Sequence, residues 1–259
     1  VIRQVYPRLG IVPGLILAPG WSQIPEVGLA LAAKAAKING VYSAMALLDL
    51  DTAKAKKYTD TKSVKEESGY TSPFCYPLWP CDRVGEYILA KSAVAGAMIQ
   101  YMASDNEDVP NQSPSNHLLG VGGQCLEDGT EVYLDQDQAN TVNGYGVTTA
   151  INQNGYRLWG NYTGAYPASS DAKDIWFAVR RMFSWQGNNF IQTYFDEVDD
   201  PMNNVLVQSV VDSENIRCSA YAPKYWAGAS IEYKSDDNPK TAILAGTMKF
   251  RQHIAPYTP

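Results

Sequence analysis

The stretch GLILAPGWSQIPEVGLALAAKAAKINGVYSAMALLDL, residues 14–50, decides the fold class. Its first six residues, 14–19, form a short apolar run closed by a proline and a glycine, which is typical of a strand that ends in a turn. From Pro25 onward apolar residues recur at helical spacing, and residues 41–50 are apolar on both faces, like a strand that is covered from two sides. The order strand, helix, strand predicts a right-handed parallel crossover.

Helices and strands continue to alternate along the rest of the chain. In the first half we predict a helix near residues 53–67, a strand over 74–80 and a long helix over 84–103. In the second half we predict a helix over 135–142, a hairpin at Asn154-Gly155, helices over 175–194 and from Asp200-Pro201 towards Ile216, and strands over 230–235 and 246–256. The pattern predicts a mixed α/β fold, a central mixed sheet flanked by helices. We expect an N-terminal part, residues 1–120, and a C-terminal part, residues 121–259, which can form one compact unit.

Composition excludes several classes of function. The chain has 259 residues, 45% of them hydrophobic, and a net charge of −6, so it can bury a sizeable core but has no basic half to hold nucleic acid. Its longest apolar stretch, residues 87–103, contains Lys91 and Gln100 and is too short and too polar to span a membrane. We therefore expect neither nucleic-acid binding nor membrane insertion.

Metal and cofactor sites lack the residues that they need. The chain has four cysteines and two histidines and contains no Cys-x-x-Cys pair. The glycines of residues 120–125, GVGGQC, are not followed by the Lys-Ser/Thr of a phosphate-binding loop. Cys75 and Cys81 are close in sequence, but we expect reduced, buried thiols. We predict no metal and no cofactor.

One catalytic alternative starts at the end of the second predicted strand. Asp49 and Asp51, in LLDLDTAKA, resemble the paired aspartates of haloacid-dehalogenase phosphatases, where one aspartate attacks phosphorus and the other is an acid and base. Ala53 stands where that family has Thr or Val. We therefore expect no enzyme, and we expect these aspartates to end a strand and to cap or solvate the residues after it.

A second alternative is a glycan-binding module. Residues 155–164, GYRLWGNYTG, follow a predicted hairpin turn and contain the sequon of Asn161. The aromatic residues that could stack on a sugar ring are Tyr156, Trp159, Tyr162 and Tyr166. Because aromatic side chains are enriched in strands, we expect them to fill core and cross-strand positions instead.

Taken in order, several long stretches resemble the contractile tail sheath proteins of bacteriophages and prophages, which are related to the sheaths of R-type bacteriocins. The stretches are LILAPGWSQIPEV (15–27), VAGAMIQYMASDNEDVPNQSPSN (94–116), DGTEVYLDQDQANTVNGYGVTTAINQNGYRLWGNYTG (128–164), DIWFAVRRMFSW (174–185), DDPMNNVLVQSVVDSENI (199–216) and GTMKFRQHIAP (246–256). The resemblance covers nearly the whole chain. It implies that this is a fragment that lacks the terminal arms, which add strands to neighbouring subunits.

The resemblance also implies a structural function. Such a subunit is made in the bacterial host cytoplasm, becomes part of the virion and joins other copies of itself in hexameric rings and a helical sheath around an inner tail tube protein. Baseplate and tail terminator would be further partners. Contraction of the sheath then drives the tube through the target cell envelope.

Particular residues acquire expected roles from the resemblance. Trp21, Arg157, Trp159 and Gly160 are expected to be architectural residues of the core. Arg217 and Lys224 are expected to face the acidic tube, because the family is thought to present a basic surface near its C-terminal helices.

Overall fold

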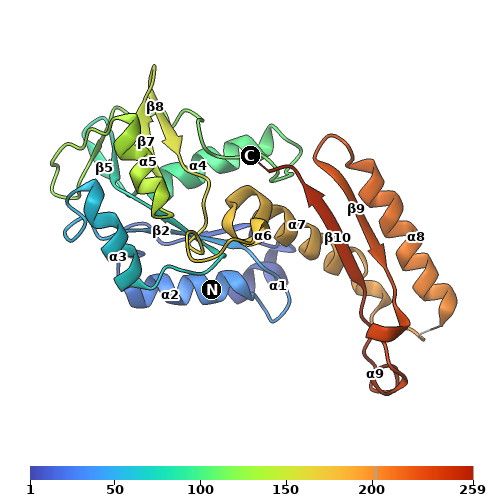
Figure 1. The fold of residues 1–259 in the computed structure, drawn as a ribbon. Coiled ribbons are helices and arrows are strands. Elements are labelled where there is room, and N and C mark those ends of the chain that lie inside the picture. Colours follow the sequence, from blue (N-terminus) through green and yellow to red (C-terminus); the bar gives the residue numbers. More distant parts are fainter. Residues whose placement is uncertain (202, 259) are drawn as a thin grey trace. The chain divides into compact units, whose positions relative to one another are not determined.

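The computed structural model describes residues 1–201 and 203–258, and the chain divides into two compact units (Figure 1). Unit 1 comprises residues 1–185 with Thr258, and unit 2 comprises residues 186–257. The division falls within helix α7, Phe177–Thr193, and not between residues 120 and 121 as expected from the sequence. The physical reason is that segments on both sides of residue 120 share one hydrophobic core.

Unit 1 contains most of the helices and strands. Its helices are α1 (Val5–Leu9), α2 (Pro25–Ala36), α3 (Thr61–Ser68), α4 (Lys91–Ser104), α5 (Gln136–Gly144), α6 (Ala172–Ile175) and the first part of α7. Its strands are β1 (Leu15–Leu17), β2 (Met45–Asp49), β3 (Cys75–Leu78), β4 (Cys81–Val84), β5 (Tyr87–Leu89), β6 (Gly123–Cys125), β7 (Thr149–Asn152) and β8 (Tyr156–Trp159). The fold is thus mixed α/β, with the strands distributed over several small sheets.

The parallel unit predicted from residues 14–50 is confirmed. β1 pairs with β2 in parallel, with Leu15 opposite Met45, and β2 pairs in parallel with β3, with Ala46 opposite Cys75. Every residue of β2 is buried. Helices α2 and α4 both contact β2, and they lie on opposite sides of the strand in Figure 1, which explains why its sequence is apolar on both faces.

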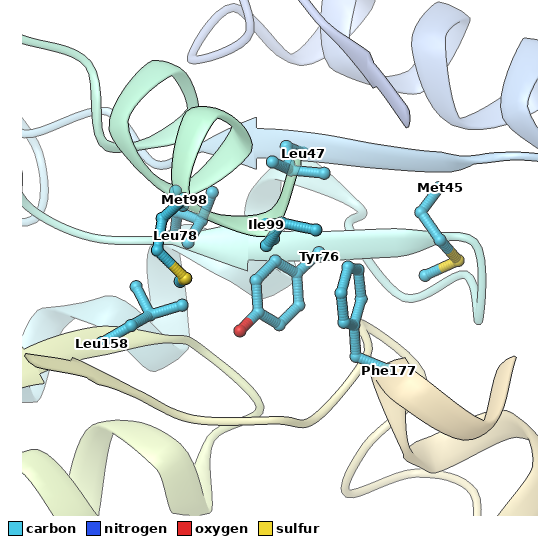
Figure 2. Packing of buried hydrophobic residues seen from close by; sticks show 9 residues of the cluster. Met45, Leu47, Tyr76, Leu78, Met98, Ile99, Leu158 and Phe177 are labelled. Carbon is cyan, nitrogen blue, oxygen red and sulfur yellow. The ribbon is translucent and has the colours of Figure 1, made fainter. Parts of the chain in front are cut away.

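The core of unit 1 forms around β2 and β3. Figure 2 shows how side chains from these strands, from α4, from β8 and from the start of α7 meet. The buried members are Met45, Leu47, Tyr76, Leu78, Ala95, Met98, Ile99, Leu158 and Phe177. Tyr76 and Phe177 stack with their ring centroids 4.1 Å apart. Burial of a large apolar side chain of this kind contributes roughly 1.5–3 kcal/mol, so this cluster contributes substantially to the stability of unit 1.

The predicted helix over residues 84–103 begins later than expected. α4 starts at Lys91, and the preceding residues form the antiparallel pair β4–β5 around Gly85, whose φ of 60° suits a tight turn. The ammonium of Lys91 pairs with the carboxylate of Asp82 in β4, and both side chains are fully buried. This pair connects the first residue of the helix to the hairpin, and the pairing of residues 87–89 with β4 keeps them extended and outside the helix.

The hairpin predicted at Asn154-Gly155 is confirmed as β7–β8. Asn154 and Gly155 have φ values of 54° and 105°, in the region that favours asparagine and glycine. The loop comprises the three residues 153–155, one more than the two-residue turn that the Asn-Gly pair predicts. The antiparallel register places Asn152 opposite Tyr156 and Thr149 opposite Trp159.

Two further helices begin later than predicted. α3 begins at Thr61 after a 3-10 turn, Tyr58–Asp60, rather than near residue 53. α7 begins at Phe177, because Trp176 is extended, with φ −93° and ψ 122°, and pairs with Tyr162 across an isolated bridge.

A buried lysine lies in the same unit: Lys65 of α3 donates hydrogen bonds from Nζ to the carbonyl oxygens of Tyr145 and Tyr166, at 2.9 and 2.5 Å.

Unit 2 consists of a helix packed on a two-stranded sheet, together with short helical turns. Its elements are α8 (Asn204–Ala220), β9 (Trp226–Glu232), α9 (Lys240–Leu244), β10 (Arg251–Pro256) and the 3-10 turns Phe195–Glu197 and Ser235–Asp237. The start predicted at Asp200-Pro201 is wrong: the N-cap of α8 is Asn203, whose Oδ1 accepts a hydrogen bond from Leu206 N at 2.9 Å. β9 and β10 are antiparallel, and α8 contacts β9.

Among the described residues, no helix combines the length and the apolar character that a membrane crossing demands. The four cysteines have free thiols, and Cys75, Cys125 and Cys218 are buried.

Candidate functional site

The carboxylate of Asp49 is enclosed by hydrogen-bond donors at the end of β2. Asp49 is 8% exposed. Its Oδ2 accepts from Ser22 Oγ at 2.8 Å and from Ser92 Oγ at 2.5 Å, and its Oδ1 accepts from the backbone N–H of Ser92 at 2.8 Å. Burial raises the pKa of Asp49 above its ordinary value, while the hydrogen bonds from Ser92 and Ser22 act in the opposite direction. The side chain thus ties β2 to the first turn of α4 and to the turn before α2.

The surroundings of Asp49 and Asp51 indicate structural roles for both side chains. A phosphatase nucleophile must present a carboxylate oxygen to its substrate, whereas both oxygens of Asp49 already have hydrogen-bond partners. Asp51 lies two residues beyond β2, and its Oδ1 accepts a hydrogen bond from Ala53 N at 2.9 Å, which closes a turn. Nor do the described residues contain a group of His, Cys, Asp and Glu side chains that could hold a metal ion.

Arg217, expected to face a tube, is engaged within unit 2. Its Nε donates to Glu214 Oε2 at 2.9 Å, and its NH2 donates to Glu214 Oε1 at 2.6 Å and to Gln186 Oε1 at 3.1 Å. The Glu214 side chain is fully buried, while that of Arg217 is 21% exposed. The charge of Arg217 is therefore compensated by a buried carboxylate, a partner that the sequence spacing of three residues on a helix could have indicated.

Lys224 is different. It lies in the turn between α8 and β9 and is exposed, with Nζ 4.6 Å from the centroid of the Tyr225 ring. Lys224 is thus the more exposed of the two basic residues expected at a tube-facing surface.

The expectation that Trp21 is a core residue is wrong. Trp21 is 64% exposed and lies in the turn between β1 and α2. Its backbone N–H donates to Ala18 O at 3.0 Å, and its carbonyl accepts from Ile24 N at 3.1 Å. These turn hydrogen bonds hold the backbone at the surface, and Ser22 is the residue of this turn that is fully buried.

Arg157, Trp159 and Gly160 connect β8 to its surroundings. Arg157 NH1 donates to Asn116 O at 2.8 Å, and Trp159 Nε1 donates to Asn140 Oδ1 of α5 at 2.9 Å. Gly160 has a φ of 141°, and a Cβ there would lie 2.7 Å from side-chain oxygens of two neighbouring residues. These contacts bind the hairpin to the 113–118 segment and to α5.

The expected glycosylation sequon is buried. Asn161 is 6% exposed and Thr163 is fully buried, so the Asn161 amide cannot receive a glycan in the folded chain.

The outer edge of the β9–β10 hairpin offers backbone hydrogen-bonding groups. Both backbone groups of Ile231 bond to the side-chain amide of Asn215, at 3.1 and 2.9 Å, so they point away from β10. Ile231 is opposite Gln252, and the groups of Gln252 therefore also point out of the hairpin. Because backbone groups alternate in direction along a strand, the N–H and C=O of Ile254 also point out of the hairpin. Within the described residues of unit 2, the outward groups of Gln252 and Ile254 have no backbone partner. The sequence predicted the strands but not this edge, because Asn215 is distant in sequence.

Comparisons with known proteins find similarity to tail sheath proteins. No family model matches it. The tail sheath protein of Escherichia phage P2 is 24% identical over 269 residues, which cover 100% of this chain and 62% of the relative. The major tail sheath protein of Serratia phage KSP20 is 28% identical over 173 residues, 64% of this chain and 42% of the relative. The chain thus spans less than two thirds of the length of either relative.

Solved structures of sheath proteins have a similar fold. The sheath complex of an extracellular contractile injection system, PVC, in its contracted state superimposes with a TM-score of 0.78 at 17% identity, covering 100% of this chain and 71% of that one. The chain is thus similar in sequence to tail sheath proteins of phages, and its fold is similar to that of a sheath protein from a contractile injection system.

Proposed function

We propose that this chain forms the core of a contractile tail sheath subunit, which polymerises with other copies around an inner tail tube and contracts to drive the tube through a target cell envelope. The observation that carries this proposal is the collinear similarity of the whole chain to the tail sheath protein of phage P2. The fold shared with the PVC sheath supports it. The assembly would be part of a phage tail or a related contractile particle, with baseplate and tail terminator at its ends.

The mechanism needs many small contacts rather than a catalytic group. A helical lattice repeats each contact between subunits many times, so a small change in packing per subunit adds up to a large change in free energy over the lattice. A well-packed core such as the cluster around Leu47 can stay unchanged while the contacts between subunits rearrange.

We assign the β10 edge of the hairpin as the acceptor for a strand from a neighbouring subunit. The outward backbone groups of Gln252 and Ile254 can form a ladder with an added strand. Gln252→Pro removes one outward N–H and is expected to prevent assembly while unit 2 stays folded, because that N–H has no partner inside the hairpin. Gln252→Thr retains the N–H and serves as the matched control. Sheaths of normal length from Gln252→Pro would contradict the assignment.

We further assign Lys224 to the surface that meets the tube. Lys224→Glu is expected to reduce sheathing of tubes most strongly at low salt, because attraction between exposed charges is screened over about 8 Å at physiological ionic strength. Lys240→Glu is the control, since Lys240 is also exposed in unit 2. Arg217→Glu does not test this surface, because it would place a second carboxylate beside the buried Glu214.

Electron microscopy tests the function directly. The protein that contains this chain is produced together with its tube protein, and the expected result is a sheath of regular helical repeat around the tube. Bare tubes beside dispersed sheath protein, at every salt concentration tried, would refute the proposal.

A further inference from the structure

Unit 1 contains an open cleft beside the β7–β8 hairpin. Its volume is about 560 Å³, which is within the range of small-molecule sites. The lining comes from the 113–116 segment, the end of α5, the end of β8 and the segment that leads to α6. The lining residues used below are Asn116, Asn140, Trp159, Asn161, Tyr162, Tyr166 and Trp176.

The chemistry of this lining is uniform. Every lining residue is uncharged, and besides glycines the set consists of serines, asparagines and the four aromatic residues. In a chain with 19% charged residues, this leaves a cleft with hydrogen-bonding amides and hydroxyls, flat apolar rings and no counter-charge. An ionic ligand would lose its hydration without gaining an opposite charge, and a wholly apolar ligand would leave the amides without partners.

One amide of the lining has an unused donor. Asn161 is 6% exposed, and its Oδ1 accepts from Ala178 N at 3.4 Å, which fixes the orientation of the side chain. Its Nδ2 is buried and has no hydrogen-bond partner among the described residues. Buried donors of this kind are rare in folded proteins. This nitrogen is closed off from solvent, so a ligand oxygen reaches it only if the side chains that line the cleft shift.

The aromatic residues are held rigidly. Tyr162 stacks between Tyr166 and Trp176, with centroid distances of 3.9 and 4.6 Å, and Trp159 is fixed by its hydrogen bond to Asn140. Both faces of Tyr162 are covered by its neighbours, so a ligand can stack only on the outer faces of this rigid set. Contact there avoids the loss of side-chain entropy that mobile residues would suffer on binding.

We propose that this cleft binds an uncharged saccharide. A pyranose ring has apolar C–H faces that fit aromatic rings and a rim of hydroxyls that can exchange hydrogen bonds with the exposed amide of Asn116 and with the other polar groups of the lining. The chain as a whole keeps its proposed structural function, and the cleft is an additional binding site within unit 1. It does not depend on assembly, so the failure of either proposal leaves the other open to its own test.

The test is a titration of the 259-residue chain with three neutral probes, maltotriose, cellotriose and chitotriose, followed by tryptophan fluorescence, since Trp159 and Trp176 line the cleft. We expect a saturable change with at least one probe. Tyr166→Ala is expected to weaken that binding about tenfold, because it removes one ring of the stack. Tyr133→Ala is the matched control: Tyr133 is an exposed tyrosine of the same unit that does not line the cleft.

A second variant guards against loss of the fold. Asn116→Gly removes an exposed amide at the rim, and because glycine tolerates the φ of 66° at this position, it should weaken binding while the urea unfolding midpoint stays close to that of the wild type. No saturable change with any of the three sugars up to their solubility limits would overturn the proposal. So would equal affinity in the wild type, Tyr166→Ala and Asn116→Gly, or preferential binding of an uncharged tripeptide offered as a competitor.

Discussion

Replacement of Asp49 by alanine tests whether this aspartate is structural. The change removes three hydrogen bonds and leaves the hydroxyls of Ser22 and Ser92 and the N–H of Ser92 without their partner. Hydrogen bonds to a charged group contribute roughly 1.5–3 kcal/mol each, but burial of the carboxylate, visible in its raised pKa, offsets part of this. We expect Asp49→Ala to lower the free energy of unfolding by about 3 kcal/mol.

Urea denaturation followed by tryptophan fluorescence measures this loss. Asp49→Asn should cost only about 1 kcal/mol, because the serine hydroxyls can turn to accept from the amide. Asp51→Ala, which removes one hydrogen bond in a turn, should also cost about 1 kcal/mol and is the neighbouring control. If Asp49→Ala unfolds at the wild-type urea concentration, or if a magnesium-dependent phosphatase activity disappears in Asp49→Asn, the structural assignment is wrong.

Three further predictions concern other contacts. Gly160→Ala should lower the free energy of unfolding by about 3 kcal/mol, because φ is positive at this residue and an added Cβ would lie 2.7 Å from neighbouring oxygens. Gly187→Ala, in a helix with open space around it, should leave that free energy unchanged or raise it by up to ~1 kcal/mol. Equal unfolding midpoints for the two variants would contradict this. Arg217→Met should cost about 3 kcal/mol in thermal or urea unfolding because it leaves Glu214 buried without its partner, and the double variant with Glu214→Met should recover stability; an additive double-mutant cycle would argue against the pair. Burial lowers the pKa of Lys65 to about 8, so above that pH the unfolded chain binds more protons than the folded chain. The free energy of unfolding of the wild type, relative to that of Lys65→Met, should therefore rise by about 2 kcal/mol from about pH 8 to 10.5. A difference between the two proteins that does not change with pH would refute this prediction.

Local patterns sufficed where the chain's own neighbours determine its conformation. Pro25 predicted the start of α2, and Asn154 with Gly155 predicted the β7–β8 turn, because both depend on backbone preferences of one or two residues. The start of α4 could not be predicted in this way. Apolar residues over 84–103 fit a helix throughout, and the hairpin that replaces its first part depends on the buried pair of Asp82 with Lys91.

The candidate site was less predictable than the fold, because its features depend on contacts between distant segments. The enclosure of Asp49 by Ser22 and Ser92 joins residues 27 and 43 positions away. Trp21 shows that a resemblance can also mislead. The resemblance to sheath proteins predicted a core residue, but the backbone hydrogen bonds of the turn place Trp21 at the surface.

The side chain of Asn215 has a consequence for how copies of this chain can join. Because its amide occupies both outward backbone groups of Ile231, the β9 edge of the hairpin is closed at that residue, while the β10 edge stays open at Gln252. A strand from another copy would then be accepted on one side only. Growth by strand addition would be polar, with one acceptor per subunit, and the hairpin could not act as a two-sided seed for unlimited ribbons.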